Sequence, residues 1–484
     1  MSMIDEIRER MCAVRIEDGE ITGAELVEQG DAESIPGLPV KNLPEHIKVS
    51  VTCRPEEGSN IKIEVWMPVQ GWNGDLVGVG NGGAAGAILS FMMAEPLRQG
   101  FAVATTDLGT SAGADCGIGN KAVWKDFGHR ATHLMTLAAK EIVKGWYGRY
   151  PGYSYFSGGS TGGQQALMEA QRYPEDYDGI LACAPAYDRT NLHLGFLWDW
   201  LALNAEGEGL FSADDEVRIV DAVLEQCGSE GDRRPGDAFL YRPDRIRMTK
   251  AVLEAAGLTQ RQMDAVMKVY EGGTNPVTGT RLYEPTLTPG SEAAGMGLVH
   301  RCERENFARD YFYIFRWVLG AEFDFTKFDF HRDAAIIHTQ LDGDLNATDT
   351  DLSRFRDRGG KLLLIHGTAD PIIPCASSIR YFEDVQKRMG DTNGFFRLFL
   401  APGMAHMSGG PGVQDIVFGL PATPKDSRHF ALLALKDWVE TGKAPDCLCP
   451  VAFKNDNPLS AFLEDGVAYE REIFPYQRER TMVE

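Results

Sequence analysis

The sequence predicts an α/β protein with a mostly parallel sheet flanked by helices and interrupted by a long inserted segment. Short apolar runs typical of buried strands alternate with amphipathic stretches typical of helices, as at Phe101–Thr106 and Ala131–Tyr147. This alternation stops after Ala186 and returns only before the apolar run that begins near Leu362. With 484 residues, the chain is also longer than a single hydrophobic core usually spans.

The first strands are predicted to form an antiparallel hairpin, because polar and apolar residues alternate in Lys48–Cys53 and Ile61–Trp66. The stretch Ala84–Met93 follows a glycine-rich loop and has a composition that predicts a helix. Within the inserted segment, we expect a helix over Leu192–Leu203 and then an irregular, charged chain to about Pro289.

The chain holds a Gly-x-Ser-x-Gly pattern around Ser160, between the predicted strand Tyr153–Gly158 and the predicted helix Thr161–Arg172. A turn between a strand and a helix of this kind strains the serine backbone, and the small residues Gly158 and Gly162 allow the chain to bend sharply. Ser160 is therefore the candidate nucleophile. Because glycine and serine are common, the pattern needs support from other residues.

Two later segments offer an acid and a base. The apolar run Lys361–His366 is typical of a strand buried on both faces, and Asp370 follows it closely. The predicted strand Phe395–Leu400 leads to a glycine-rich loop that contains His406. Asp370 could instead make only a loop hydrogen bond, and His406 could be an ordinary histidine. The order serine, acid, histidine favours an α/β-hydrolase fold with the catalytic triad Ser160, Asp370 and His406.

A triad of this kind also needs backbone N–H groups that bind the oxyanion. The residue after the nucleophile, Thr161, is the first candidate donor. The second is Gly82 or Gly83, in the loop that follows the apolar run Asp75–Gly80. The sequence does not choose between the two glycines, and a tight turn alone could also require glycine there.

The catalytic domain is predicted to comprise residues 1–186 and 336–484, with residues 187–335 forming an inserted lid domain. Two aromatic clusters in this lid, Phe196–Trp200 and Tyr311–Trp317, could line a pocket for an aromatic acyl group. They could equally form the core of the lid itself, since aromatic residues at helical spacing usually pack inward.

Several further blocks have a recognisable pattern: Glu64–Pro68, Trp72–Gly74, Gly78–Gly83, Asp126–Gly128, Tyr153–Ala186, Asn346–Asp349 and Gly359–Leu364, besides the Asp370 and His406 loops. Together they resemble the tannase and feruloyl esterase family of α/β-hydrolases, from about Ile61 to Trp438. The resemblance implies a serine esterase acting on esters of aromatic acids, such as gallates, ferulates or the half-ester of terephthalate. It also implies the inserted lid domain.

Two features depart from the family pattern. Members commonly carry a cysteine before the nucleophile and another after the catalytic histidine, joined by a disulfide, whereas Gly159 and Met407 occupy these positions here. The joint loss is expected where disulfides do not persist. Members also usually have a calcium loop in the lid, but the corresponding stretch Cys227–Ala238 contains Arg233 and Arg234, which oppose a divalent cation. We therefore expect no calcium there.

The composition excludes several classes of binding partner. The net charge of −22 argues against nucleic-acid binding, and no apolar run is long enough to cross a membrane. The nine cysteines do not form a disulfide framework, and the lone pair Cys447 and Cys449 lacks the second pair of a zinc site. We thus expect no metal or other cofactor. The N-terminus lacks the apolar core of a signal peptide, which predicts a cytoplasmic enzyme; the oligomeric state stays open.

The sequence therefore predicts a carboxylic ester hydrolase that works by two-step acyl transfer through Ser160 on a small aromatic ester. Two alternatives remain. A transacylase would use the same triad but pass the acyl group to an alcohol, and a catalytically silent relative would only bind its ligand.

Overall fold

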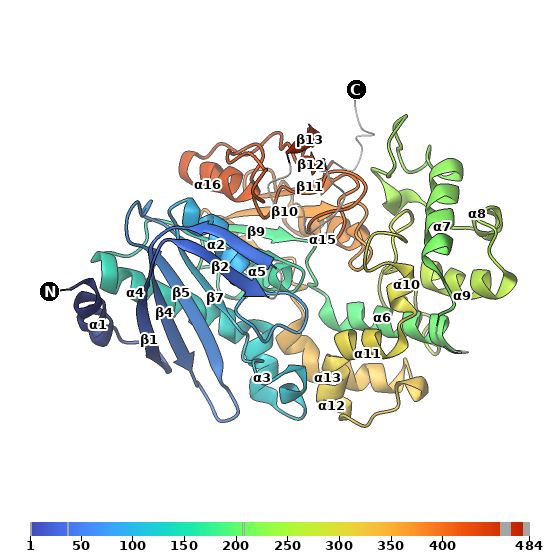
Figure 1. Ribbon diagram of the computed structural model, residues 1–484. Helices are drawn as coiled ribbons and strands as arrows, with labels where there is room; N and C mark the ends of the chain where they lie inside the picture. Colours follow the sequence, from blue (N-terminus) through green and yellow to red (C-terminus); the bar gives the residue numbers. More distant parts are fainter. Residues whose placement is uncertain (1, 36–37, 206, 208, 455–465, 478–484) are drawn as a thin grey trace.

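The computed structural model describes residues 2–35, 38–205, 207, 209–454 and 466–477. Its centre is a nine-stranded sheet of order β1-β4-β5-β7-β6-β8-β9-β10-β11 (Figure 1). The strands are β1 (Gly19–Val27), β4 (His46–Cys53), β5 (Ile61–Pro68), β6 (Leu76–Val79), β7 (Ala102–Thr106), β8 (Ser154–Gly159), β9 (Gly179–Cys183), β10 (Lys361–Gly367) and β11 (Phe396–Ala401).

The sheet is antiparallel at one edge and parallel elsewhere. β1, β4, β5 and β7 pair antiparallel, whereas β7, β6, β8, β9, β10 and β11 pair parallel. The predicted hairpin is confirmed, because β4 and β5 pair from Cys53 opposite Ile61 onward. All residues of β6, β7 and β9 are buried, as expected for parallel strands covered on both faces. Two smaller ladders join β2 (Gly30–Ile35) to β3 (Leu38–Leu43) and β12 (Val451–Phe453) to β13 (Val467–Glu470).

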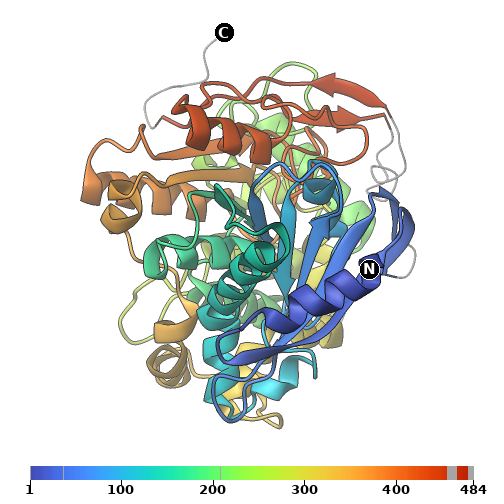
Figure 2. The ribbon, with the colours of Figure 1, turned by 90° about the vertical axis from the view of Figure 1, so that its left-hand side faces the viewer.

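Two apolar clusters hold helices on opposite faces of this sheet. Side chains of α2 and α16 pack in one cluster, and side chains of α4, α5 and α15 pack in the other. In Figure 2 the N-terminal helix α1 lies at the front of the molecule, and its buried Ile7 and Met11 belong to the same cluster as α4. These helices are α1 (Met3–Ala13), α2 (Ser90–Arg98), α4 (Ala131–Tyr147), α5 (Thr161–Arg172), α15 (Cys375–Met389) and α16 (Ala431–Thr441).

The predicted helix over Ala84–Met93 is wrong, because α2 begins only at Ser90. The chain before it is an irregular loop, in which Ala85 and Gly86 have φ angles of 58° and 88°. The Gly86 N–H donates to the Asp107 carbonyl at 3.2 Å, so this loop bonds to the neighbouring loop instead of forming helical hydrogen bonds.

Between β9 and β10 the chain contains several helices, and Figure 1 shows α6 to α13 gathered at one end of the sheet. The predicted irregular stretch to about Pro289 is wrong where α7, α8 and α9 lie, whereas residues 228–249 and 273–289 form no α-helix, as predicted. Capping boxes at Ser212 and Thr259 start two of its helices, and apolar residues at helical spacing bury one face of each. These helices are α6 (Arg189–Asn204), α7 (Ala213–Gln226), α8 (Lys250–Ala255), α9 (Gln260–Glu271), α10 (Leu298–Arg301), α11 (Arg304–Tyr311), α12 (Tyr313–Leu319) and α13 (Arg332–Leu345). The short helix α14 (Ser353–Asp357) follows them before β10, and another short helix, α3 (Lys121–Lys125), precedes α4.

The inserted helices pack in two groups. α7, α8 and α9 share an apolar cluster of their own, whereas α6, α12 and α13 join the core that covers the sheet. The lid boundaries at residues 187 and 335 remain a prediction.

Candidate active site

Ser160 lies in the sharp turn between β8 and α5, with φ 58° and ψ −116°. Its backbone is held on both sides: the Ser160 N–H donates to the Cys183 carbonyl at 2.9 Å, and the Ser160 carbonyl accepts from Ala186 N–H at 3.0 Å. A side chain at Gly158 would place its Cβ 2.4 Å from the Gly162 carbonyl oxygen. Glycine is therefore required for the turn, and the hydrogen bonds maintain the strained serine conformation.

Asp370 and His406 are directly joined. Asp370 follows β10 and is completely buried, and its Oδ2 accepts from His406 Nδ1 at 2.7 Å. Its other oxygen, Oδ1, accepts from the N–H groups of Ile372 and Ile373 at 2.9 and 3.0 Å. Because a carboxylate only accepts, Nδ1 of His406 carries the proton and Nε2 is left as the basic nitrogen.

A second histidine stands against the same carboxylate. Nε2 of the buried His366 lies 2.8 Å from the Ile373 carbonyl and 3.4 Å from Asp370 Oδ2. Its Nδ1 lies 2.7 Å from Ser378 Oγ. Burial by itself would raise the pKa of Asp370, but the charge and hydrogen bonds of His406 and His366 outweigh it and lower the pKa below its usual value. Asp370 is thus an anion at neutral pH.

The turn of Ser160 and the loop of His406 touch at their neighbouring residues. A Cβ built on Gly159 would lie 2.2 Å from Sδ of Met407. Gly159 and Met407 occupy the two positions where the family resemblance implies disulfide-bonded cysteines. All nine cysteines, which lie within the described residues, are free.

The candidate oxyanion donors lie on two segments that are bonded to each other. Oγ1 of Thr161 donates to the Gly83 carbonyl at 2.7 Å, and the Gly162 N–H donates to the Asn81 carbonyl at 2.8 Å. Among the described residues, the N–H groups of Gly82 and Gly83 have no backbone acceptor. Both glycines therefore keep a free donor next to the nucleophile turn, and the geometry leaves the choice between them open.

A fully buried arginine, Arg189, holds this arrangement from behind. Its Nη2 donates to Thr161 Oγ1 at 2.9 Å, and its Nη1 donates to the hydroxyl of Tyr313 at 2.6 Å. Neither Arg189 nor the role of His366 was predicted from the sequence. His366 ends a predicted strand, and Arg189 lies just before the predicted helix Leu192–Leu203, so neither falls in a motif that could have singled it out.

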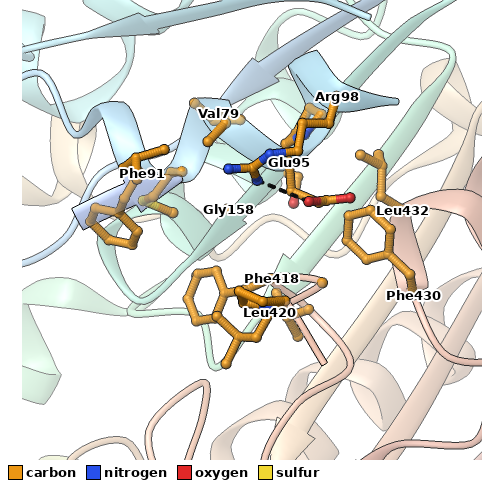
Figure 3. A pocket seen from close by; sticks show the side chains of 18 of the residues that line it. Val79, Phe91, Glu95, Arg98, Gly158, Phe418, Leu420, Phe430 and Leu432 are labelled. Carbon is orange, nitrogen blue, oxygen red and sulfur yellow. Dashed lines mark hydrogen bonds and ion pairs between the residues drawn. The ribbon is translucent and has the colours of Figure 1, made fainter. Parts of the chain in front are cut away.

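Two cavities border these loops. One of about 70 Å³ lies beside Gly158, enclosed by apolar side chains such as Phe91 and Phe430 and by the ion pair of Glu95 with Arg98 (Figure 3). It is far below the roughly 300 Å³ at which ligand sites begin. The other, an open hollow of about 510 Å³, lies against Gly83 and Ala84 and reaches α11 and α12 of the insertion. Its size suits a small substrate.

The aromatic clusters of the insertion are mostly core residues. Phe196, Trp200, Tyr313, Phe315 and Trp317 are all buried within the apolar cluster that covers the sheet. Of the two interpretations of the sequence, packing in the core therefore accounts for these five residues.

The stretch expected to correspond to the family's calcium loop has arginine partners. Asp232 pairs with Arg245 and Asp237 pairs with Arg471, both at 2.8 Å. Arg233 donates to the Asp237 carbonyl in the same stretch and to the Leu224 carbonyl of α7. Carboxylates already bonded to guanidinium groups do not form the oxygen cage that calcium needs.

The other grouping of metal-ligand residue types within the described chain is His429, Cys449 and Glu470, near the β12–β13 ladder. Both ring nitrogens of His429 already face carboxylates, Asp426 at 2.8 Å and Glu470 at 3.0 Å. The contacts of His429 with these two carboxylates account for the cluster without a metal. Within the described residues, no helix has both the length and the apolar character to span a bilayer. The cytoplasmic location stays a prediction.

Comparison with known proteins decides the family. The family model described as tannase and feruloyl esterase matches residues 47–479. The chain belongs to this family. It is 33% identical to an uncharacterized esterase of Xanthomonas campestris, over 96% of this chain and 87% of that protein. It is 30% identical to probable feruloyl esterase B-1 of Aspergillus flavus, over 84% of this chain and 79% of that protein.

Solved structures agree with this assignment. Feruloyl esterase B from Aspergillus oryzae superposes with a TM-score of 0.84 at 26% identity and covers 98% of this chain and 96% of its own. Tannin acyl hydrolase from Aspergillus niger gives a TM-score of 0.67 at 17% identity, covers 96% of this chain and 91% of its own, and shows likeness of fold alone. The α/β-hydrolase fold and the carboxylic ester hydrolase class predicted from the sequence are confirmed.

Proposed function

We propose that this tannase and feruloyl esterase family member is a serine esterase that cleaves esters of aromatic, phenolic acids through an acyl-enzyme on Ser160. The observation that carries the proposal is the hydrogen bond of 2.7 Å between His406 and the buried anion of Asp370. The loop that carries His406 contacts the strained turn that carries Ser160. The feruloyl esterase relatives support an aromatic acid as the acyl group.

In this mechanism, Nε2 of His406 takes the proton of Ser160 as the hydroxyl attacks the ester carbonyl. Asp370 holds the Nδ1–H and stabilises the imidazolium that forms. The alcohol leaves with the proton returned from His406. Water then attacks the acyl-enzyme by the same route and releases the acid.

The oxyanion of each tetrahedral intermediate would bind the Thr161 N–H and the N–H of Gly82 or Gly83. Donors that are already oriented cost no reorganisation during the reaction, and in many enzymes such donors contribute more to the rate than any other group. The support for this role is the free state of both glycine N–H groups and the hydrogen bond that ties Thr161 to Gly83.

The open hollow beside Gly83 is where we propose that part of the substrate lies. Arg309, Asp310 and Arg316 of the insertion line it and offer donors and acceptors to phenolic or alcohol hydroxyls. We further propose that the inserted helices act as the lid that selects the acid and excludes bulk water.

A hydrolysis panel tests the function. Methyl ferulate, methyl gallate, mono(2-hydroxyethyl) terephthalate and the aliphatic methyl butyrate are compared by kcat/KM, with Ser160→Ala as the control. At least one aromatic ester should exceed the aliphatic one, and the variant should lose all of these activities. Faster cleavage of the aliphatic ester than of every aromatic one would refute the substrate class.

The two alternatives have their own measurements. A transacylase would release a new ester when an alcohol such as glycerol is added, and the acid alone would be the minor product. A silent binding protein would not be labelled on Ser160 by a fluorophosphonate. The Asp370–His406 pair favours catalysis, because a histidine held through Nδ1 by a buried carboxylate presents Nε2 to a hydroxyl.

A further inference from the structure

Arg189 is a buried cation without a carboxylate partner among the described residues. It is 2% exposed and begins α6, immediately behind the nucleophile turn. Its Nη1 and Nη2 donate to hydroxyl groups, and its Nε has no partner. Its Cζ lies over the ring of Phe127, 5.0 Å from the centroid. An uncompensated buried charge is costly, so its retention calls for a reason.

The groups around Arg189 do not neutralise it. His193, one turn along α6, has its pKa lowered to about 3 by burial and by the charge of Arg189, and is therefore neutral. Burial raises the pKa of Tyr313, so its hydroxyl keeps its proton. The positive charge of the guanidinium thus remains unbalanced in the resting protein.

Two consecutive hydrogen bonds connect the Arg189 guanidinium to the segments of the candidate oxyanion donors. Arg189 Nη2 donates to Thr161 Oγ1 at 2.9 Å, and Thr161 Oγ1 donates to the Gly83 carbonyl at 2.7 Å. Hydrogen bonds in series polarise one another in a buried setting. The side chain of Thr161, held by Arg189, therefore joins the two backbone segments that offer the free N–H groups.

We propose that Arg189 is a positioning residue, which holds the Thr161 and Gly83 segments at the spacing that the oxyanion needs and adds its charge to their potential. The inference rests on the proposed function, because the oxyanion forms only if Ser160 attacks an ester. The negative charge would appear in the transition state and not in the bound ester. Arg189 would therefore stabilise the transition state selectively and raise kcat more than it lowers KM.

The bond to Tyr313 extends the same network to the insertion. Tyr313 is the first residue of α12, and its hydroxyl accepts the second donor of Arg189. The placement of α12 therefore bears on the placement of the guanidinium. Tyr313→Phe removes this acceptor without removing the charge, so a smaller loss of kcat is expected than for removal of Arg189.

The first test compares Arg189→Met and Thr161→Val with the conservative variant Thr161→Ser and with the exposed control Arg354→Met, on methyl ferulate. Loss of one oxyanion donor typically costs about 10²–10³ in kcat, and we expect Arg189→Met and Thr161→Val to approach the lower figure with little change in KM. Thr161→Ser keeps the hydroxyl, so it should lose less kcat than Thr161→Val. Arg354→Met removes an exposed arginine and its surface ion pair with Glu175, so its kcat should stay near wild type. The double variant should be no worse than the more damaged single one.

The second test uses phenylboronic acid, a probe of the charged intermediate. The Ser160 Oγ–H adds to the trigonal boron, an O–B bond forms, the proton passes to His406, and the boron becomes a tetrahedral anion. The inhibition constant should rise in Arg189→Met and Thr161→Val by a factor that follows the loss of kcat. Binding of neutral methyl ferulate to the Ser160→Ala background should change little. A residue with only a structural role would lower the melting temperature without this selectivity.

The outcomes separate the two proposals. If Ser160→Ala kept its activity, or phenylboronic acid failed to inhibit the wild type, the proposed function would be refuted. In the other case, the wild type behaves as expected while Arg189→Met and Thr161→Val keep their kcat, or change only in KM. That result would refute the role of Arg189. Should Arg189→Met fail to fold, Thr161→Val carries the same test alone, since it removes the hydroxyl and keeps the side-chain shape.

Discussion

Asp370 beside the nucleophile turn and Glu292 in the insertion are both completely buried, yet their pKa values shift in opposite directions. The pKa of Asp370 is lowered, because His406 and His366 outweigh the effect of burial. Burial raises the pKa of Glu292 to about 7, and the hydrogen bonds from Tyr270 and Gly290 offset it only in part. The partner of a buried carboxylate, more than its burial, decides its charge.

The kind of partner also differs between the two regions. In the insertion, Asp199 faces Arg301 at 2.9 Å, with both side chains buried, and arginine keeps its charge at every working pH. At the candidate site, the partners of Asp370 are the imidazoles of His406 and His366. A permanent cation suits a structural pair, whereas acyl transfer needs a partner that exchanges protons.

The largest expected effect breaks the candidate site itself. Because triad residues act as one unit, Ser160→Ala and His406→Ala should each lower kcat on the order of 10⁴ to 10⁶, and the double variant should be little worse. Single-turnover and steady-state rates on methyl ferulate measure this. Losses that add up in the double variant would contradict a shared mechanism.

The comparison of Asp370 with Glu292 is tested most sharply by changing each acid to its amide. Asp370→Asn removes the charge that orients and stabilises His406, and we expect a fall in kcat of about 10⁴. Glu292→Gln replaces an acid whose pKa is raised by burial and which lies outside the candidate site, so kcat should stay near wild type. Near-normal kcat in Asp370→Asn would assign the acid role to another residue.

The pH dependence of stability should carry the opposite signs of the two shifts. Glu292 has a folded pKa of about 7 against an ordinary 4.5, so its contribution is complete below about pH 4.5 and is lost as the pH rises through 7. Asp370 has a lowered pKa, and its contribution is lost as the pH falls below its ordinary range.

Urea unfolding at pH 5 and pH 8 measures the Glu292 effect. Each pKa unit corresponds to about 1.4 kcal/mol, so the wild type should lose stability over this interval by an amount of that order relative to Glu292→Gln. Parallel changes in the two proteins would mean that Glu292 is already ionised at pH 5.

Reductant should have no effect on the candidate site. The turn of Ser160 and the loop of His406 meet through Gly159 and Met407, and the nine cysteines are free, so packing and hydrogen bonds hold the geometry. Hydrolysis of methyl ferulate and titratable thiols are measured with and without dithiothreitol. Loss of activity together with new thiols would reveal a structural disulfide.

Chelation should likewise leave the insertion unchanged. Arg245 and Arg471 already pair with Asp232 and Asp237, where a calcium loop would offer carboxylates to the ion. The melting temperature and kcat with EDTA should match those without it. A fall of several degrees that calcium restores would show that the arginines do not replace the metal.

The sequence by itself determined the features that depend on local pattern. α4 and α5 have the predicted limits Ala131–Tyr147 and Thr161–Arg172, because helical spacing of apolar residues is visible within one segment. Ser160, Asp370 and His406 could be proposed because strand ends and glycine-rich loops mark them. The helix wrongly predicted at Ala84–Met93 shows the limit of this approach, since bonds to a neighbouring loop override local composition.

Only the tertiary structure decided the charges and the partners. Asp237 and Arg471 are 234 positions apart in the chain, and no local pattern joins them. The same holds for Arg189, whose bonds reach Thr161 and Tyr313 from an otherwise ordinary helix start. Desolvation and contacts between distant residues set the pKa of Asp370 and leave Arg189 without a carboxylate partner among the described residues. These effects arise only when the chain has folded.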